Sequence, residues 1–191
     1  NKSHAAAYAV VSYQTAWLKY YFPVEYMAAL MTSVIDNPSK VSEYIYACRQ
    51  MNIKILPPDI NKGEANFSVD GGDIRYGLAA IKSIGRPVIK AIVEDREELG
   101  LFQNLEDFIT RLSAKNILNK RTIENLIKAG ALDTLGGTRK QFMSIYVQIV
   151  DHVTQEKKNS MVGQMTLFDL VSEDQKEEFQ IRMRDVGEYS K

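Results

Sequence analysis

Residues that start and stop helices divide this sequence into short segments. Side chains that cap helix N-termini recur along the chain, at Asn37 before a proline, at Asn104, at Asn119, and at Thr138 with a glutamine three residues later. Between these signals the apolar residues recur at helical spacing, and Gly130 is typical of the position after a helix C-terminus. The sequence therefore predicts a mainly α fold built from short helices.

The first fifty residues contain three of these predicted helices. Ser3 would cap a helix that ends before Pro23, a second helix follows directly, and the third opens at Asn37. The first helix is apolar on most of its faces and so needs cover on most of them. We therefore expect these helices to pack loosely on the rest, and the chain to dimerise at high concentration through Ala5–Leu30. This exposed character and the first residue, Asn1, favour excision from a longer protein.

One stretch, near residues 53–76, departs from helical spacing. Residues 53–60 alternate briefly between apolar and polar before Pro57 and Pro58 end the alternation, which predicts a short edge strand. Two segments flanking Gly71 and Gly72 predict a β-hairpin with a glycine-rich turn. We expect a small β element within the helical fold.

Composition excludes several classes of protein. The 191 residues are 45% hydrophobic and 25% charged, which argues against a disordered or low-complexity chain. A single cysteine, Cys48, excludes an internal disulfide, and one cysteine with two histidines makes a structural zinc site unfavourable. We therefore expect a cytoplasmic protein. No apolar stretch is long enough to predict a membrane span. The net charge is zero, but residues 71–150 carry twelve basic and nine acidic side chains, whereas residues 151–191 carry six and nine. A polyanion would therefore meet the middle of the chain. The alternative is an ordinary fluctuation, since most globular domains show charge differences of this size, and only a motif can decide between the two.

The segment Leu78–Ile92 has the form of a helix-hairpin-helix, two short helices joined by a small–apolar–glycine turn. Glycine lets a ligand approach the backbone, and the unpaired amides and dipole of the second helix attract phosphate. The predicted DNA-binding residues are Lys82, Ser83, Ile84, Gly85, Arg86 and Lys90. Ser83 stands where glycine is usual in such hairpins. The alternative is a plain helical hairpin with solvated lysines. A similar unit at residues 105–129 suggests a degenerate duplication.

A second motif, Gly163 to Leu170, lies in the acidic stretch near the C-terminus. Gln164 followed by Leu167 and Phe168 has the form of the linear peptide with which replication proteins dock on the bacterial sliding clamp. The apolar pair would fill a pocket, with Met165 beside it, and Gln164 would hydrogen-bond at a neighbouring site. The alternative is a short amphipathic segment that folds back on its own domain.

Residues that could carry chemistry are few. Lys2, Ser3 and His4 lie beside a helix start and could contact a triphosphate or a DNA phosphate. Residue chemistry alone favours the alternative, ordinary helix capping with exposed charge. No P-loop, metalloprotease or dinucleotide-binding motif is present, and no pair of closely spaced aspartates occurs in a strand context. The sequence therefore predicts no catalytic residue and no metal ligand.

Eight segments, taken together, carry a resemblance to a known family. They are residues 1–8, 12–15, 23–29, 53–61, 74–82, 119–121, 127–131 and 163–168. In order and spacing they resemble the alpha subunits of bacterial DNA polymerase III, the C-family replicative polymerases. The resemblance implies that residues 1–51 are the C-terminal part of the fingers domain, that residues 52–155 form a tandem helix-hairpin-helix domain that binds the clamp, and that residues 156–191 are a flexible acidic tail carrying the clamp motif.

The same resemblance implies a function. The parent would be a DNA-directed DNA polymerase, a nucleotidyltransferase of chromosome replication, whose Mg²⁺-binding palm aspartates lie upstream, so this segment would be inactive and without a cofactor. Lys120 and Arg121 would join the DNA-binding residues. The expected partners are duplex DNA, the sliding clamp (β subunit), the remaining polymerase domains and other replisome subunits. The alternative is a helical packing module that contacts other polymerase domains or subunits without binding DNA itself.

Overall fold

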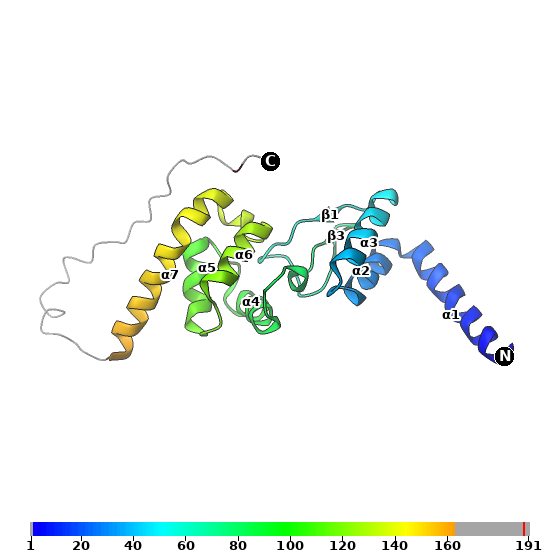
Figure 1. Ribbon diagram of the computed structural model, residues 1–191, viewed down its shortest axis with the longest axis horizontal. Helices are drawn as coiled ribbons and strands as arrows, with labels where there is room; N and C mark the ends of the chain where they lie inside the picture. Colours follow the sequence, from blue (N-terminus) through cyan, green and yellow to red (C-terminus); the bar gives the residue numbers. More distant parts are fainter. Residues whose placement is uncertain (1, 163–188, 190–191) are drawn as a thin grey trace, which may run out of the picture. The chain divides into compact units, whose positions relative to one another are not determined.

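The computed structural model describes residues 2–162 and Tyr189 of the chain. The chain divides into two compact units, Asn1–Lys90 and Ala91–Lys191, and the boundary falls within helix α4 (Arg86–Leu99). Helices make up most of the described residues, together with one small sheet of short strands (Figure 1). The prediction of a mainly α fold with a small β element is confirmed.

Three helices begin the first unit, α1 (Lys2–Tyr21), α2 (Pro23–Ser33) and α3 (Pro38–Gln50). A proline occupies the first position of α2 and of α3, where its missing N–H costs nothing. The Asn37 side chain accepts a hydrogen bond from the Lys40 amide at 3.1 Å, as a capping residue should. In the described residues α1 already begins at Lys2, so Ser3 lies within the helix and is not its N-cap.

The small sheet has the strand order β1–β3–β2. Strands β2 (Ser68–Asp70) and β3 (Asp73–Arg75) form the expected antiparallel hairpin, and both turn glycines have positive φ, 63° at Gly71 and 94° at Gly72. Strand β1 (Ile55–Leu56) pairs parallel with β3 at the edge of the sheet. The predicted edge strand and hairpin are therefore both present.

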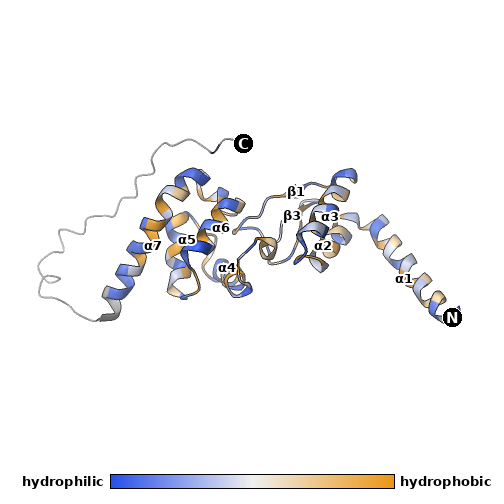
Figure 2. Cartoon of the chain, in the orientation of Figure 1, coloured by the Kyte–Doolittle hydropathy of each residue, from blue (hydrophilic) through white to orange (hydrophobic). Residues whose placement is uncertain are grey.

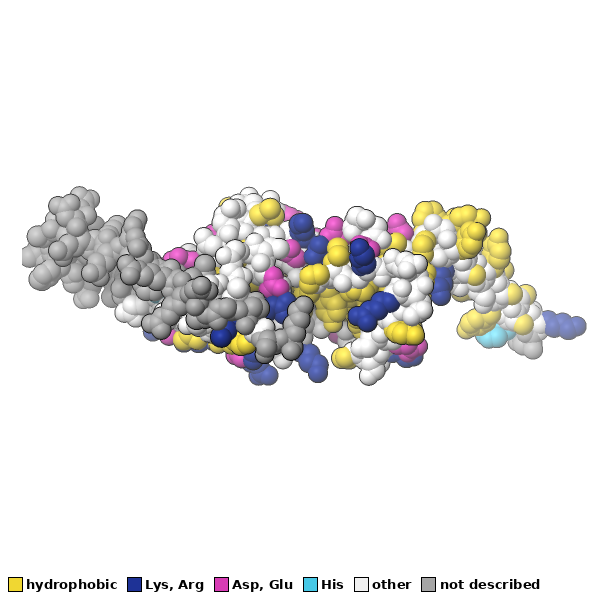
Figure 3. All heavy atoms as spheres, turned by 90° about the horizontal axis from the view of Figure 1, so that it is seen from above, with side chains coloured by type: hydrophobic (Ala, Val, Ile, Leu, Met, Phe, Trp, Pro, Cys, Tyr) yellow, Lys and Arg dark blue, Asp and Glu magenta, His cyan; other side chains and the backbone are white. Residues whose placement is uncertain are grey.

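A continuous apolar core joins α2, α3 and the sheet in the first unit. Its buried members are Met27, Ala28, Met31, Ile35, Val41, Cys48, Ile53, Phe67 and Ile74. Helix α1 contributes no buried residue to this core. Figure 3 shows hydrophobic side chains over the surface of α1, and exposed aromatic residues include Tyr13 at 71% and Tyr20 at 78% of their full accessible area.

The second unit is built around three helices, α5 (Leu105–Ala114), α6 (Lys120–Ala129) and α7 (Arg139–Val162). The Asn104 and Asn119 side chains each cap their helix at 2.9 Å, and Thr138 and Gln141 exchange the two hydrogen bonds of a capping box. Gly130 ends α6 in the left-handed conformation, with φ at 81°. Every helix boundary predicted from these signals is present.

Helix α7 packs against both α5 and α6. Apolar and polar segments alternate along α7 in Figure 2, as expected for a helix with one buried stripe. The buried residues include Phe108, Leu112, Ile123, Leu126, Phe142 and Ile149. The helix continues to Val162, beyond residue 155, so the first residues of the expected tail belong to α7.

Candidate nucleic-acid interface

The first turn, residues 81–85, joins a short 3-10 helix, η1 (Leu78–Ala80), to α4. The motif predicted a short helix before the turn, and this helix is only a 3-10 turn, because Ile81 already has extended backbone angles. Ser83 adopts the left-handed conformation with φ at 63°, which a residue with a side chain adopts at a cost. Ile84 is buried and holds the turn against the protein, whereas its two neighbours in the turn are exposed.

Gly85 occupies the N-cap position of α4. Its carbonyl accepts hydrogen bonds from the amides of Val88 at 3.0 Å and Ile89 at 3.3 Å. Glycine has no side chain with which to cap the helix, and Pro87 has no N–H. The exposed amides of Gly85 and Arg86 make no hydrogen bond within the described part of the chain. A Cβ built on Gly85 meets only the Pro87 ring, at 3.6 Å, so solvent or a ligand reaches this backbone freely.

Three basic side chains surround the first turn, and all are exposed: Lys82, Arg86 and Lys90. The Arg86 guanidinium lies 3.8 Å from the Asp36 carboxylate, with the two side chains 75% and 87% exposed. An ion pair so open to water holds its partners weakly, so Arg86 can turn toward another anion. The structure thus brings together all six residues that the motif predicted in the first turn and the start of α4.

The second turn, residues 115–119, joins α5 to α6 and repeats part of the first. Asn116 has a φ of 56°, like Ser83 in the first turn. The N-terminus of α6 is nevertheless closed by the Asn119 side chain, which accepts from the Thr122 amide at 2.9 Å. Lys120 pairs with Asp151 of α7 at 2.6 Å, and Arg121 is exposed.

Lys157 was assigned by its sequence position to the tail, but it belongs to α7 and contacts the second turn. Its Nζ atom donates to the carbonyl oxygens of Ser113 at 3.2 Å and Ala114 at 3.4 Å, and to Asn116 Oδ1 at 2.5 Å. Sequence reasoning missed this contact because more than forty residues separate the partners. Only the helical register of α7 could have indicated it.

A buried carboxylate joins the end of α4 to α5. Asp95 is 1% exposed, and its Oδ2 atom accepts from Arg111 Nε at 2.6 Å while Lys115 Nζ lies 2.9 Å from Oδ1. Arg111 also donates to the carbonyl oxygens of Asp95 and Gly100, both at 2.9 Å, and stacks over the Phe102 ring. Asp107 Oδ2, 3.3 Å from Arg111 Nη1, supplies the second negative charge, so two carboxylates balance two cations and the cluster is structural.

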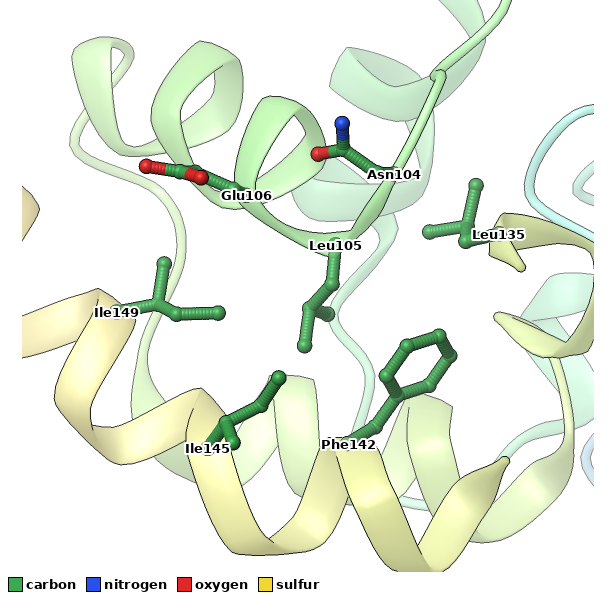
Figure 4. A pocket seen from close by; sticks show the side chains of 7 residues that line it. All are labelled: Asn104, Leu105, Glu106, Leu135, Phe142, Ile145 and Ile149. Atoms are coloured by element: carbon green, nitrogen blue, oxygen red, sulfur yellow. The ribbon is translucent and has the colours of Figure 1, made fainter. Parts of the chain in front are cut away.

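An apolar pocket of about 200 Å³ lies between α5 and α7 (Figure 4). Leu105, Leu135, Phe142, Ile145 and Ile149 form its walls, with Asn104 and Glu106 at one side. The walls are buried core residues, and the pocket brings no pair of titratable groups together. It therefore offers no arrangement for acid–base chemistry.

The remaining predicted site residues lie elsewhere. Ser3 and His4 are exposed in the first turns of α1, beside Lys2, and the His4 ring packs edge-on against Tyr8. Gln164, Met165, Leu167 and Phe168 lie outside the described residues. Within residues 2–162 and Tyr189, no three His, Cys, Asp or Glu side chains gather as metal ligands. No helix in this part of the chain is both long and apolar enough to span a bilayer.

Comparison with known proteins agrees with the turn geometry. The sequence profile of the helix-hairpin-helix motif matches residues 52–142, so the chain contains a helix-hairpin-helix region. The DNA polymerase III subunit alpha of Vibrio cholerae is 45% identical over 99% of this chain, that of Escherichia coli K12 is 45% identical over 91%, and that of Mycobacterium tuberculosis H37Rv is 44% identical over 88%. The chain belongs to the family of the bacterial DNA polymerase III alpha subunit. It spans 14–16% of the length of these relatives.

Proposed function

We propose that this chain is the part of a bacterial replicative DNA polymerase that holds duplex DNA, and that it does so through the first turn. The observation that carries the proposal is the glycine N-cap of α4, where two exposed amides find no acceptor among the described residues and no Cβ obstructs the approach. Such a helix start receives a phosphate oxygen, and Lys82, Arg86 and Lys90 add positive charge around it.

Binding at the first turn would not depend on base sequence. Backbone amides and flexible cations contact phosphates, and none of these groups reads a base edge. Each phosphate contact releases condensed counterions, so affinity should fall steeply as salt is raised, with a slope near one unit per contact. This is the behaviour that a polymerase needs in order to hold any product duplex.

The test is fluorescence anisotropy with a labelled duplex at several salt concentrations. Gly85→Val should abolish binding, because the added side chain covers the two amides while its Cβ meets only the Pro87 ring. Lys82→Ala should lower the salt slope by about one unit. Lys19→Ala, the same change on exposed α1, is the matched control and should leave both quantities unchanged. Full affinity in a folded Gly85→Val variant would favour the alternative, a helical packing module.

The second part of the proposal concerns the sliding clamp. Gln164, Leu167 and Phe168 match the clamp-docking peptide in sequence, and they follow shortly after the end of α7 at Val162. The apolar pair should supply most of the affinity and Gln164 the register. The peptide alone should bind in the micromolar range, and tethering to a DNA-holding domain raises its effective concentration to about the millimolar range.

Titration with a bacterial clamp tests this docking. Replacing both Leu167 and Phe168 by alanine should eliminate clamp binding and leave helix content and DNA affinity unchanged. Equal clamp affinity of both forms would mean that the pattern is fortuitous. A large loss of helix in the variant would mean that the pair belongs to the core of the protein.

The parent polymerase would carry the chemistry elsewhere. The proposal places its Mg²⁺ ions and palm carboxylates outside this chain, and gives Lys2, Ser3 and His4 at most a contact near the incoming nucleotide. The purified chain should therefore extend no primer, since two-metal phosphoryl transfer needs paired carboxylates. Primer extension by this chain alone would refute that assignment.

A further inference from the structure

The two hairpin turns differ in what already occupies them. At the first turn the amides of Gly85 and Arg86 have no acceptor in the described part of the chain. At the second turn, Asn119 caps α6, and Lys157 lies on the carbonyl oxygens that end α5. Two turns of similar form therefore present different surfaces to a polyanion.

Lys157 has the chemistry of an anchor at the second turn. An ammonium group has three N–H donors, and three acceptors surround this one: the carbonyl oxygens of Ser113 and Ala114, and Oδ1 of Asn116. The carbonyl oxygens at a helix C-terminus carry partial negative charge, which favours a cation there. The three donors of Lys157 are consequently used within the protein and not for DNA, although this basic residue lies next to a predicted DNA-binding turn.

A second contact holds α7 on the other side of the same turn. Asp151, six residues before Lys157 and thus about 9 Å away along the helix, pairs with Lys120 at the start of α6 at 2.6 Å. One contact thus reaches the end of α5 and the other the start of α6. Asp151 also offsets the charge of Lys120. Lys120 and Lys157 are therefore both engaged in contacts between α7 and this turn, and not with an external anion.

We propose that the second turn is the anchoring site of α7 and not a second phosphate site, and that Lys157 is its positioning residue. Helix α7 ends at Val162, five residues and about 7 Å beyond Lys157, so the contact fixes the point from which the residues around Gln164 depart. This inference rests on the proposed function, because it sets where a clamp-docking peptide starts relative to the second hairpin.

Hydrogen exchange on the full chain tests the anchor. Lys157→Met keeps the length of the side chain and removes the three donors. It should speed amide exchange in the second turn and in the last two turns of α7 by roughly tenfold to a hundredfold, the effect of losing a charge-assisted hydrogen bond. Lys157→Arg should restore most of the protection, and Asp151→Asn should give a smaller increase. Lys158→Met, at an exposed neighbouring residue, is the control and should change nothing. Unchanged exchange in Lys157→Met would overturn the anchor.

Duplex binding tests the inference that the first turn binds phosphate and the second turn does not. Lys120→Met and Lys157→Met should leave the salt slope within experimental error of the wild type, whereas Lys82→Met should lower it by about one unit. An equally large drop in the salt slope for Lys120→Met and for Lys82→Met would show that the second turn also binds phosphate, and would overturn this inference. If the wild-type chain itself does not bind duplex DNA, the proposed function fails, and the exchange experiment still decides whether Lys157 anchors α7.

Discussion

Ser83 holds a backbone conformation that its side chain makes costly, with φ at 63°. A non-glycine residue in the left-handed region costs about 1–2 kcal/mol, whereas glycine loses about 0.5–1 kcal/mol more chain entropy on folding. Ser83→Gly should therefore raise the free energy of unfolding by about 0.5–1 kcal/mol in urea titrations and leave duplex affinity intact.

The second turn supplies the comparison. Asn116 has nearly the same φ, but asparagine tolerates this region better, and its Oδ1 accepts from Lys157. Asn116→Gly should for this reason stabilise the protein less than Ser83→Gly, or destabilise it. A loss of stability in Ser83→Gly would mean that the serine side chain itself holds the first turn together.

Cys48 is fully buried, and burial raises the pKa of its thiol because the thiolate is the form that loses hydration. The contribution of the buried, neutral Cys48 thiol to the free energy of unfolding is fully present below the pKa of the unfolded thiol. This contribution is lost as the pH rises through the higher pKa of the folded thiol. We expect iodoacetamide to label Cys48 only as the protein unfolds. Mass spectrometry measures the extent of labelling across a urea series at pH 8. Rapid labelling of the folded chain would contradict this burial.

At the scale of helices and strands, the sequence predicted what depends on neighbours in the chain. Asparagine caps and the Thr138 capping box act over three residues, so composition and spacing reveal them. Lys157 contacts the second turn across more than forty residues, and polar composition after residue 155 hid the continuation of α7. The first hairpin site was predictable, because its six residues are contiguous or nearly so, whereas the closure of the second turn depends on tertiary packing.

The ion cluster between α4 and α5 was likewise invisible in the sequence, and it should be the most sensitive polar contact in the second unit. Asp95→Asn removes the buried carboxylate from Arg111, whose side chain is 14% exposed and keeps the Asp107 carboxylate at 3.3 Å, and from the more exposed Lys115. Removing one partner from such a cluster should lower the free energy of unfolding by about 3 kcal/mol in chemical denaturation.

A matched control comes from Asp133, which pairs with Arg139 at 2.6 Å while the two side chains remain 43% and 39% exposed. Asp133→Asn should cost less than about 1 kcal/mol, since water screens and replaces an exposed pair. Similar losses in both variants would show that burial does not set the strength of the Asp95 cluster.

On the scale of the whole molecule, the prediction that the first three helices expose apolar faces is correct for α1 but wrong for α2 and α3. Met27, Ala28 and Met31 of α2 and Val41 and Cys48 of α3 are buried in the first core. In α1, by contrast, Tyr13, Trp17 and Tyr20 are exposed. Any self-association should accordingly use α1 and not the full range Ala5–Leu30.

Sedimentation velocity over a hundredfold range of concentration measures this association. The wild-type chain should dimerise weakly at the highest concentrations, and Trp17→Glu with Tyr13→Glu should remain monomeric, because charges oppose burial of the aromatic face. Lys19→Glu, a charge change at a residue of the same helix that is already polar, is the control and should leave the weak dimerisation unchanged. Dimers that persist in the double variant would place the contact on another surface.

Because α1 contributes no buried side chain, its helical state depends on local propensity and on its junction with α2. Most of the stability of a helix in a protein comes from the tertiary packing of one face, and α1 buries no residue in such packing. Heating the chain should thus melt α1 gradually, as a sloping loss of far-UV dichroism ahead of the sharp transition of the packed helices. A calorimetric enthalpy scaled to residues 2–162, the continuous range that the structure describes, would overestimate the cooperative unit by about the length of that helix.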